Sequence, residues 1–426
     1  MTSPLAAARV AVLVAAAEAG WEAEVLDRLE RGGPAVRLGK RCVDLPDLLA
    51  SATTGLASAA VVAPGLPGLD ADSVATLQRA GVGVLVVGTV EELRDDEPER
   101  LRRLGVAHVL TVAELPDLPG AVLAAGDGVR PVDDEPVATA DAASPPGRLL
   151  AVWGPAGAPG RTTVAVGVAA ELARAGHETF LLDVDPYGGA VAQHLGVLDE
   201  VSGLLAAARS ANSGLLDVER LGGYGRQVDD GLRVLTGLPR ADRWREVRPA
   251  AFEDLLDASR DLAGHVVLDT GFSLESEDAA DPFGGGAPQR NEMTLAAVRS
   301  ADEVLVVGAA DPVGLARLAR GLVELRDLVP GVRPRVVVNR TRTSLGWSDR
   351  EIRGMVEGFV TPLDVHFLPD DRAAADRALM AGQSLTETGE SELRSTLAAV
   401  ARAVTGDPAV APGRRGLRRR RAGRDR

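Results

Sequence analysis

The sequence predicts an α/β protein of two domains, each a parallel β-sheet with helices on both faces. Apolar runs alternate with helix-period segments over residues 9–125. Residues 126–147 are rich in Pro, Ala and Asp and have no apolar period, which is typical of a linker. From Arg148 a second, longer alternation begins. Strands that alternate with helices form parallel sheets covered by those helices, so both domains are expected to be doubly wound.

The first domain is predicted to span residues 1–125 and to hold five strands. These are Arg9–Ala15, Ala35–Val43, Ala59–Ala63, Val82–Val87 and Val106–Leu110. Helices are expected between them, at Trp21–Arg31, Asp72–Ala80 and Glu91–Leu104.

This plan resembles a response-regulator receiver domain, which has a flavodoxin-like fold, and Ala63–Asp70 is similar to the loop after the third receiver strand. The resemblance places Ala63 at the phosphoacceptor aspartate, Ala15–Ala17 at the acidic pair and Val112 near the lysine. A domain without those carboxylates has neither ligands for Mg²⁺ nor a group to phosphorylate. We therefore expect a degenerate receiver used for docking; the alternative is an unrelated small α/β domain.

The second domain is predicted to span residues 148–406 and to be followed by an Arg-rich, disordered tail at 407–426. Its expected strands are Leu149–Trp153, Thr179–Val184, Leu232–Leu235, His265–Leu268, Glu303–Val307, Arg335–Val338 and Asp364–Phe367. Its expected helices are Thr162–Ala175, Pro249–Leu262, Asn291–Ser300, Val313–Leu328, Asp371–Ala381 and Glu390–Val404. The segment Glu275–Gln289 interrupts the pattern and is expected to be a mobile loop.

A degenerate P-loop opens this second domain. An apolar strand leads into a glycine-rich turn and then into a helix, the arrangement that cradles phosphate oxygens with backbone N–H groups. Gly160 and Thr162 fit the pattern G-x-x-x-x-G-K-[ST], whereas Arg161 replaces its lysine and Pro155 its first glycine. Lys40 is the only lysine of the chain, so no lysine of this domain can replace the missing one. A guanidinium is larger and forked, so it needs a roomier loop than an ammonium.

Three aspartates are expected beside this loop. Asp183 and Asp185 end the strand that starts at Thr179, and Asp269 ends the strand that starts at His265. The carboxyl ends of parallel strands meet at one edge of a sheet, where such folds bind their ligands. Mg²⁺ binds hydroxyl and carboxylate oxygens around a phosphate, and Thr162 with Asp269 would supply them.

The P-loop, the strand with Asp183 and Asp185 and the strand with Asp269 follow one another in the order found in the ParA/MinD family of P-loop ATPases. The chain resembles that family from Arg148 to about Thr405. The resemblance implies bound ATP and Mg²⁺. It implies Asp185 as the catalytic residue that orients the attacking water, and Thr162, Asp183 and Asp269 around Mg²⁺. It also implies that Asn339 reads adenine and that Pro369 and Asp370 flank the base. The residues implied to bind nucleotide are Gly157, Ala158, Gly160, Arg161, Thr162, Thr163, Asn339, Pro369 and Asp370.

Departures from the family pattern predict slow or absent hydrolysis. Ala156 stands at the family's signature lysine, which reaches the nucleotide of the partner subunit, and Arg161 replaces the second lysine. Pro159 lacks the backbone N–H of the residue it replaces. Cations that stabilise a transferring phosphoryl group are worth orders of magnitude in rate.

A ParA-like domain behind a degenerate receiver is similar to the CpaE/TadZ group and to the septum-site-determining protein Ssd. That resemblance implies a cytoplasmic, nucleotide-dependent homodimer that positions pilus-assembly or septum machinery, with partners bound through the first domain. An active ParA/MinD-type ATPase in partitioning or division-site selection is the first alternative. A scaffold that binds no nucleotide is the second.

The composition bears on disulfides, metal sites and charged partners. The single cysteine, Cys42, excludes an internal disulfide and fits a reducing cytoplasm. The five histidines are not at metal-ligand spacing, so no structural metal site is expected. The net charge is −14, although the last fifteen residues hold eight Arg and one Asp. This tail is expected to be a solvated end; an anionic membrane contact or a non-specific nucleic-acid contact are the alternatives, with the membrane contact favoured.

Overall fold

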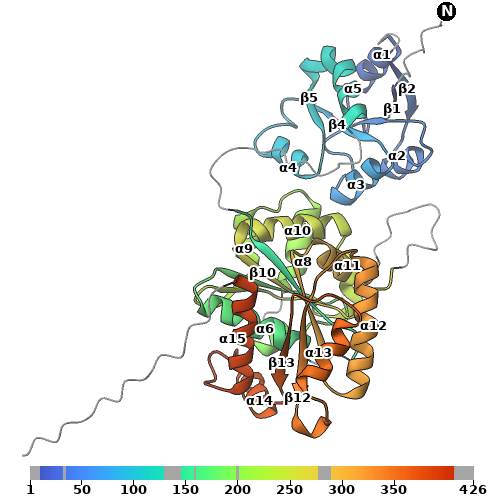
Figure 1. Cartoon of the computed structure of the whole chain (residues 1–426). Coiled ribbons are helices and arrows are strands. Elements are labelled where there is room, and N and C mark those ends of the chain that lie inside the picture. The colour runs from blue at the N-terminus through green and yellow to red at the C-terminus, as the bar shows by residue number, and fades with distance from the viewer. Residues whose placement is uncertain are drawn as a thin grey trace, which may run out of the picture.

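The computed structural model describes residues 10–31, 35–128, 145–157, 160–197, 201–276 and 289–406. It contains two separate sheets, one of five strands and one of eight (Figure 1). The predicted tail 407–426, most of the predicted linker and residues 277–288 of the predicted loop lie outside the described residues.

The five-stranded sheet is parallel, in the order β2-β1-β3-β4-β5, which is the flavodoxin-like order. Its strands are β1 Val10–Ala15, β2 Val36–Arg41, β3 Ala59–Val62, β4 Gly83–Gly88 and β5 His108–Thr111. Its helices are α1 Glu22–Arg31, α2 Leu45–Ala52, α3 Ala71–Arg79, α4 Glu97–Arg103, the 3-10 helix η1 Val112–Asp117, and α5 Leu118–Gly128.

Three predictions for this domain need correction. The helix expected at Glu91–Leu104 begins only at Glu97, because Pro98 occupies its first turn, where a missing N–H is tolerated. Helix α2 was not expected, although Asp44 caps it by accepting the N–H of Asp47. Helix α5 continues to Gly128, into the segment predicted as a linker.

The carboxyl ends of β1 and β3 meet where the receiver resemblance places the lost carboxylates. The N–H of Ala63 donates to the carbonyl of Ala15, and both alanines are buried. No carboxylate stands at either position, so the receiver origin of this domain stays a prediction that rests on its topology and on these two replaced residues.

The eight-stranded sheet has the order β13-β12-β11-β6-β10-β7-β9-β8 and is parallel except for β8 at its edge. The strands are β6 Arg148–Trp153, β7 Thr179–Val184, β8 Arg226–Asp229, β9 Leu232–Leu235, β10 His265–Thr270, β11 Glu303–Ala309, β12 Arg335–Thr341 and β13 Asp364–Pro369. The helices are α6 Arg161–Arg174, α7 Val191–His194, α8 Gly203–Asn212, α9 Val218–Tyr224, α10 Pro249–Leu262, α11 Glu292–Ser300, α12 Pro312–Leu328, α13 Asp349–Glu357, α14 Arg372–Ala381 and α15 Glu392–Thr405; the 3-10 helices are η2 Ala241–Glu246 and η3 Thr343–Leu345.

All seven predicted strands of this domain are present, because each is an apolar run between turn residues. The six predicted helices are also present, with ends that differ by at most two residues. Helices α7, α8, α9 and α13 and strand β8 were missed, and α7 has only four residues. Ser202, Asp217 and Ser348 cap α8, α9 and α13 by accepting backbone N–H groups, so capping signals would have found these three.

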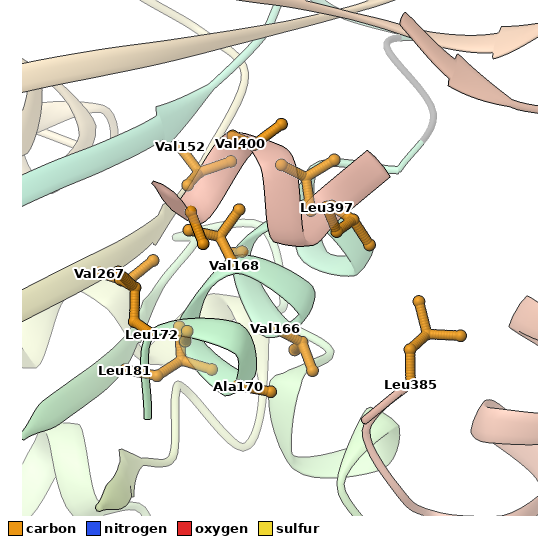
Figure 2. Close-up of a cluster of buried hydrophobic side chains, with 14 of the residues drawn as sticks. Val152, Val166, Val168, Ala170, Leu172, Leu181, Val267, Leu385, Leu397 and Val400 are labelled. Atoms are coloured by element: carbon orange, nitrogen blue, oxygen red, sulfur yellow. The ribbon is translucent and has the colours of Figure 1, made fainter. Parts of the chain in front are cut away.

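Helix α6 is the central helix of the second domain and connects the P-loop to its core. Residues 164–173 of α6 are all buried, and Val166, Val168 and Leu172 pack in one apolar cluster with Leu397 and Val400 of α15 (Figure 2). The helices approach closely at Gly167, where a Cβ would lie 2.6 Å from Cδ1 of Leu397. The N-terminus of α6 is therefore held firmly against the sheet.

The two domains contact each other through α3 on one side and α8 and α10 on the other (Figure 1). Arg248 donates to Asp72 at 2.9 Å, and Nδ2 of Asn212 donates to Asp70 at 3.0 Å. Ala250 packs against the apolar core of the first domain. Helix α4 also reaches the second domain, where Arg100 donates to the carbonyl of Ser213 at 3.4 Å. The faces of α3 and α4 are thus at least partly covered by the second domain.

A double-mutant cycle tests this contact. Asp72→Ala, Arg248→Ala and the double variant are expected to show a coupling free energy of about 0.5–1 kcal/mol, because the Asp72 side chain is mostly buried while Arg248 is partly exposed. The measurement is the free energy of unfolding by denaturant. Additive effects would mean that the domains do not dock through this pair in solution.

Candidate functional site

The site lies at the carboxyl ends of β6, β10 and β7, which are adjacent in the sheet. Strand β6 leads into the P-loop, and α6 begins at Arg161. Gly157 and Gly160 adopt φ angles of +72° and +106°, a region that favours glycine. Ala158 and Pro159, two of the predicted loop residues, lie outside the described residues. The first N–H groups of α6 have no partner within the helix and are directed at the loop.

Arg161 is held inside the loop by two neighbours. Its Nη1 donates to the carbonyl of Gly154 at 3.1 Å, and its Nη2 lies 3.7 Å from Oδ2 of Asp185. Both side chains are largely buried, with exposed fractions of 17% and 15%. Part of the hydrogen-bonding capacity of Arg161 is thus used within the protein. A phosphate at this loop would compete with Gly154 and Asp185 for the guanidinium.

Thr162 and Asp269 form the pair expected of a magnesium site. Thr162 Oγ1 donates to Oδ2 of Asp269 at 2.7 Å, whereas Oδ1 of Asp269 is buried without a hydrogen-bond partner. Burial, followed by the charge of nearby Asp183, raises the pKa of Asp269 well above its ordinary value. A buried carboxylate oxygen without a donor beside a threonine hydroxyl fits the oxygen ligands that Mg²⁺ takes. The residues present therefore suit this ion.

Asp183 is buried beside Asp269 and is hydrogen-bonded to the loop that follows β7. Asp183 lies opposite Asp269 on the neighbouring strand, and its Oδ2 accepts the N–H of Val191 at 3.1 Å. Gly189 and Gly237 leave room for its carboxylate, since a Cβ at either would collide with it. Burial raises the pKa of Asp183 to about 7. Asp183 thus anchors the loop after β7 through the backbone of Val191. Its place around Mg²⁺ stays a prediction.

Asp185 stands at the mouth of the P-loop. Its Oδ1 accepts the N–H of Tyr187 at 2.9 Å, and its Oδ2 faces Arg161. The role of Asp185 in orienting an attacking water molecule stays a prediction. Its place beside the P-loop is the one expected from the carboxyl edge of the sheet, although β10 separates β6 from β7. The ion pair with Arg161, 24 positions away in the chain, was not predicted.

A cavity of about 330 Å³ joins the end of the P-loop to the predicted base-binding residues. Its lining includes Gly160, Thr163, Asn339, Pro369 and Asp370, which come from three separate parts of the sequence. The side chain of Asn339 lies against Gly160 so closely that a Cβ there would overlap its Nδ2. All the predicted base-binding residues thus lie at one cavity of the size that small ligands occupy.

Two arginines of this cavity were missed. Arg340 and Arg372 also line it, and Nε of Arg372 lies 3.3 Å from Oδ1 of Asp370. Arg340 directly follows Asn339, so its position near the cavity could have been predicted from the end of β12. The position of Arg372 could not, because it depends on where α14 begins. Both add positive charge at the open side of the predicted adenine pocket.

Among the residues that the structure describes, no group of three or more His, Cys, Asp or Glu side chains is arranged to hold a metal ion. Within the same residues, every helix is too short or too polar to cross a membrane.

Comparison with known proteins places the fold. No protein-family model matches the chain. The chain is 30% identical over 195 residues to the chromosome-partitioning ATPase Soj of Thermus thermophilus, and the match covers 44% of this chain. It spans 66% of that relative's length, just under two thirds.

Two solved structures are similar to part of this chain. A ParA family ATPase from Chlorobium tepidum superposes with a TM-score of 0.50 at 17% identity, over 60% of this chain and 98% of the other. The cell division ATPase MinD of Pyrococcus furiosus gives 0.49 at 19% identity, over 61% and 99%. The second domain thus shares its fold with the Chlorobium tepidum ATPase.

Proposed function

From the relationship of this chain to the ParA/MinD family of P-loop ATPases, we propose that it is a nucleotide-dependent positioning protein. In this proposal ATP with Mg²⁺ binds at the P-loop and stabilises a homodimer, as a ligand does when it prefers one state. The dimer localises pilus-assembly or septum machinery, in the manner of CpaE, TadZ and Ssd, by way of the first domain. The single observation that carries it is the Thr162–Asp269 pair at 2.7 Å beside a cavity lined by Asn339, Pro369 and Asp370.

In this mechanism the protein binds and orients, and its own hydrolysis is slow. The N-terminus of α6 and Arg161 receive the phosphates, and Thr162 with Asp269 would hold Mg²⁺, which neutralises phosphate charge when bound. Asn339, Pro369 and Asp370 would receive the base. Ala156 supplies no cation to a partner's nucleotide, so the transition state for hydrolysis lacks one of its usual stabilising charges.

Calorimetric titration with ATP and Mg²⁺ tests the proposal. We expect micromolar binding to the unaltered protein and about tenfold or more weaker binding to Arg161→Ala, because a hydrogen-bonded charge on phosphate is lost. Arg161→Lys, which restores the ordinary P-loop residue, is expected to bind at least as well as the unaltered protein. Absence of ATP binding to the unaltered protein would refute the proposal and favour a scaffold that uses no nucleotide.

An active ParA/MinD-type ATPase is the second candidate, favoured by the position of Asp185 beside the loop and by the similarity to a partitioning ATPase. Phosphate release from the purified protein distinguishes the two. Sustained turnover that Asp185→Ala abolishes would support this candidate over slow or absent hydrolysis.

The membrane and nucleic-acid alternatives concern the Arg-rich tail, which lies outside the described residues. For this segment we propose electrostatic contact with an anionic membrane, since eight arginines within fifteen residues favour anionic surfaces.

A further inference from the structure

Arg317, on α12, lies directly over the P-loop. Gly157 is exposed, and a Cβ at this position would overlap Nη1 of Arg317 and lie 3.0 Å from its Cζ. The two residues are 160 positions apart, so only the packing of α12 beside β6 brings them together. The positive φ of Gly157 and the absence of its side chain together leave the space that the guanidinium occupies.

A close helix contact holds Arg317 in this place. Gly321 lies one helical turn further along the same face of α12, since residues four apart are neighbours on a helix. A Cβ at Gly321 would lie 3.0 Å from the Trp153 ring and 3.1 Å from Pro155. Gly321 therefore allows α12 to approach the first residues of the P-loop, and that approach brings Arg317 to Gly157.

The guanidinium of Arg317 is also uncommitted. Within the described residues it forms no ion pair and no hydrogen bond, and its residue is exposed. Arg161 differs in this respect, because it already contacts Gly154 and Asp185. Ala156, which adjoins Gly157, carries no charge. Arg317 is thus a free cation at the turn of a loop that lacks both of its usual lysines.

We propose that Arg317 binds the phosphate oxygens of the nucleotide at the Gly157 turn and so supplies a positive charge that Ala156 does not. This inference rests on the proposed function, since it needs a nucleotide at the P-loop. A forked guanidinium pairs with two phosphate oxygens at once and keeps its charge at any physiological pH. Its backbone lies on a packed helix, so only the side chain has to be ordered when the ligand binds.

Titration of the full-length protein with ATP, ADP and adenosine, each with Mg²⁺, tests this role. The variants are Arg317→Ala, Arg317→Lys and, as matched control, Arg320→Ala, which removes an exposed arginine from the same helix. We expect Arg317→Ala to weaken ATP binding about tenfold or more, to weaken ADP binding less, and to leave adenosine binding unchanged. Arg317→Lys is expected to lie between, and Arg320→Ala within about twofold of the unaltered protein.

Each other outcome overturns the inference in a recognisable way. Unchanged ATP affinity in Arg317→Ala would show that the guanidinium does not reach the phosphates. Equal weakening of ATP and adenosine would mean that Arg317 only shapes the loop, and an equal loss in Arg320→Ala would mean a general effect of charge. If the unaltered protein binds no ATP, the proposed function itself fails and this inference with it. If ATP binds but Arg317→Ala behaves normally, only the inference fails.

Discussion

Replacement of Asp269 by Asn is expected to remove Mg²⁺-dependent ATP binding while it stabilises the protein without ligand. The side chain is buried, opposite Asp183, with one oxygen that has no hydrogen-bond donor. A neutral amide of the same size still accepts from Thr162 but repels Asp183 less. We expect the free energy of unfolding at pH 8 to rise by about 1–3 kcal/mol, and the Mg²⁺ enhancement of ATP affinity to fall by an order of magnitude or more.

The raised pKa values also predict the direction in which the free energy of unfolding changes with pH. A carboxyl group with a raised pKa binds its proton more tightly in the native state than in the unfolded state. The contribution of this group to the free energy of unfolding is therefore complete at low pH and is lost as the pH rises through the pKa of the folded state. With the pKa of Asp183 raised to about 7 from 3.8, that loss is expected between about pH 4 and pH 7. The slope should flatten in Asp269→Asn, since Asp269 has a raised pKa of its own and its contribution to the slope is then gone.

Asp311→Asn is the matched control. Asp311 caps α12 by accepting the N–H groups of Val313 and Gly314, and Asn caps helices about equally well. This variant removes the same charge from the same domain and should change neither quantity. Loss of stability in Asp269→Asn, or unchanged Mg²⁺ dependence, would contradict the assignment of Asp269 to the ion.

Leu397→Ala is expected to destabilise the second domain by about 2–5 kcal/mol. Leu397 is fully buried in the cluster of Figure 2 and contacts α6 at Gly167. Truncation removes buried methyl groups and leaves a cavity that Gly167, without a side chain, cannot fill. Because α6 carries Arg161 and Thr162 at its start, nucleotide binding should weaken together with stability. The measurement is the denaturant midpoint, with and without ATP.

Leu379→Ala serves as the control for this variant, because Leu379 on α14 is 47% exposed. It removes the same atoms from a half-exposed position and should cost less than about 1 kcal/mol. Equal losses in the two variants would mean that α15 does not pack on α6 as described.

The P-loop domain was predictable because its strands are buried on both faces. Such strands read as nearly continuous apolar runs, and three of them carry a polar residue near their carboxyl end, namely Asp183, Asp269 and Asn339. The rule that ligands bind at the carboxyl edge of a parallel sheet then placed Thr162 and Asp269 together. Helix α8 escaped prediction because most of its residues are small, and α9 because it has seven residues with two adjacent glycines among them.

The two sheets, the P-loop and the residues around it follow from local sequence patterns and from the rule for the carboxyl edge of a parallel sheet. The arrangement of the charges follows from the packing of the folded chain. This packing turned Arg161 onto Gly154 and Asp185, directed Asp183 to the backbone of Val191, and placed Arg317 over Gly157. The physical reason is that these contacts depend on which helix packs beside which strand, at distances of a few ångströms, and side chains far apart in the chain carry no local signal of that packing.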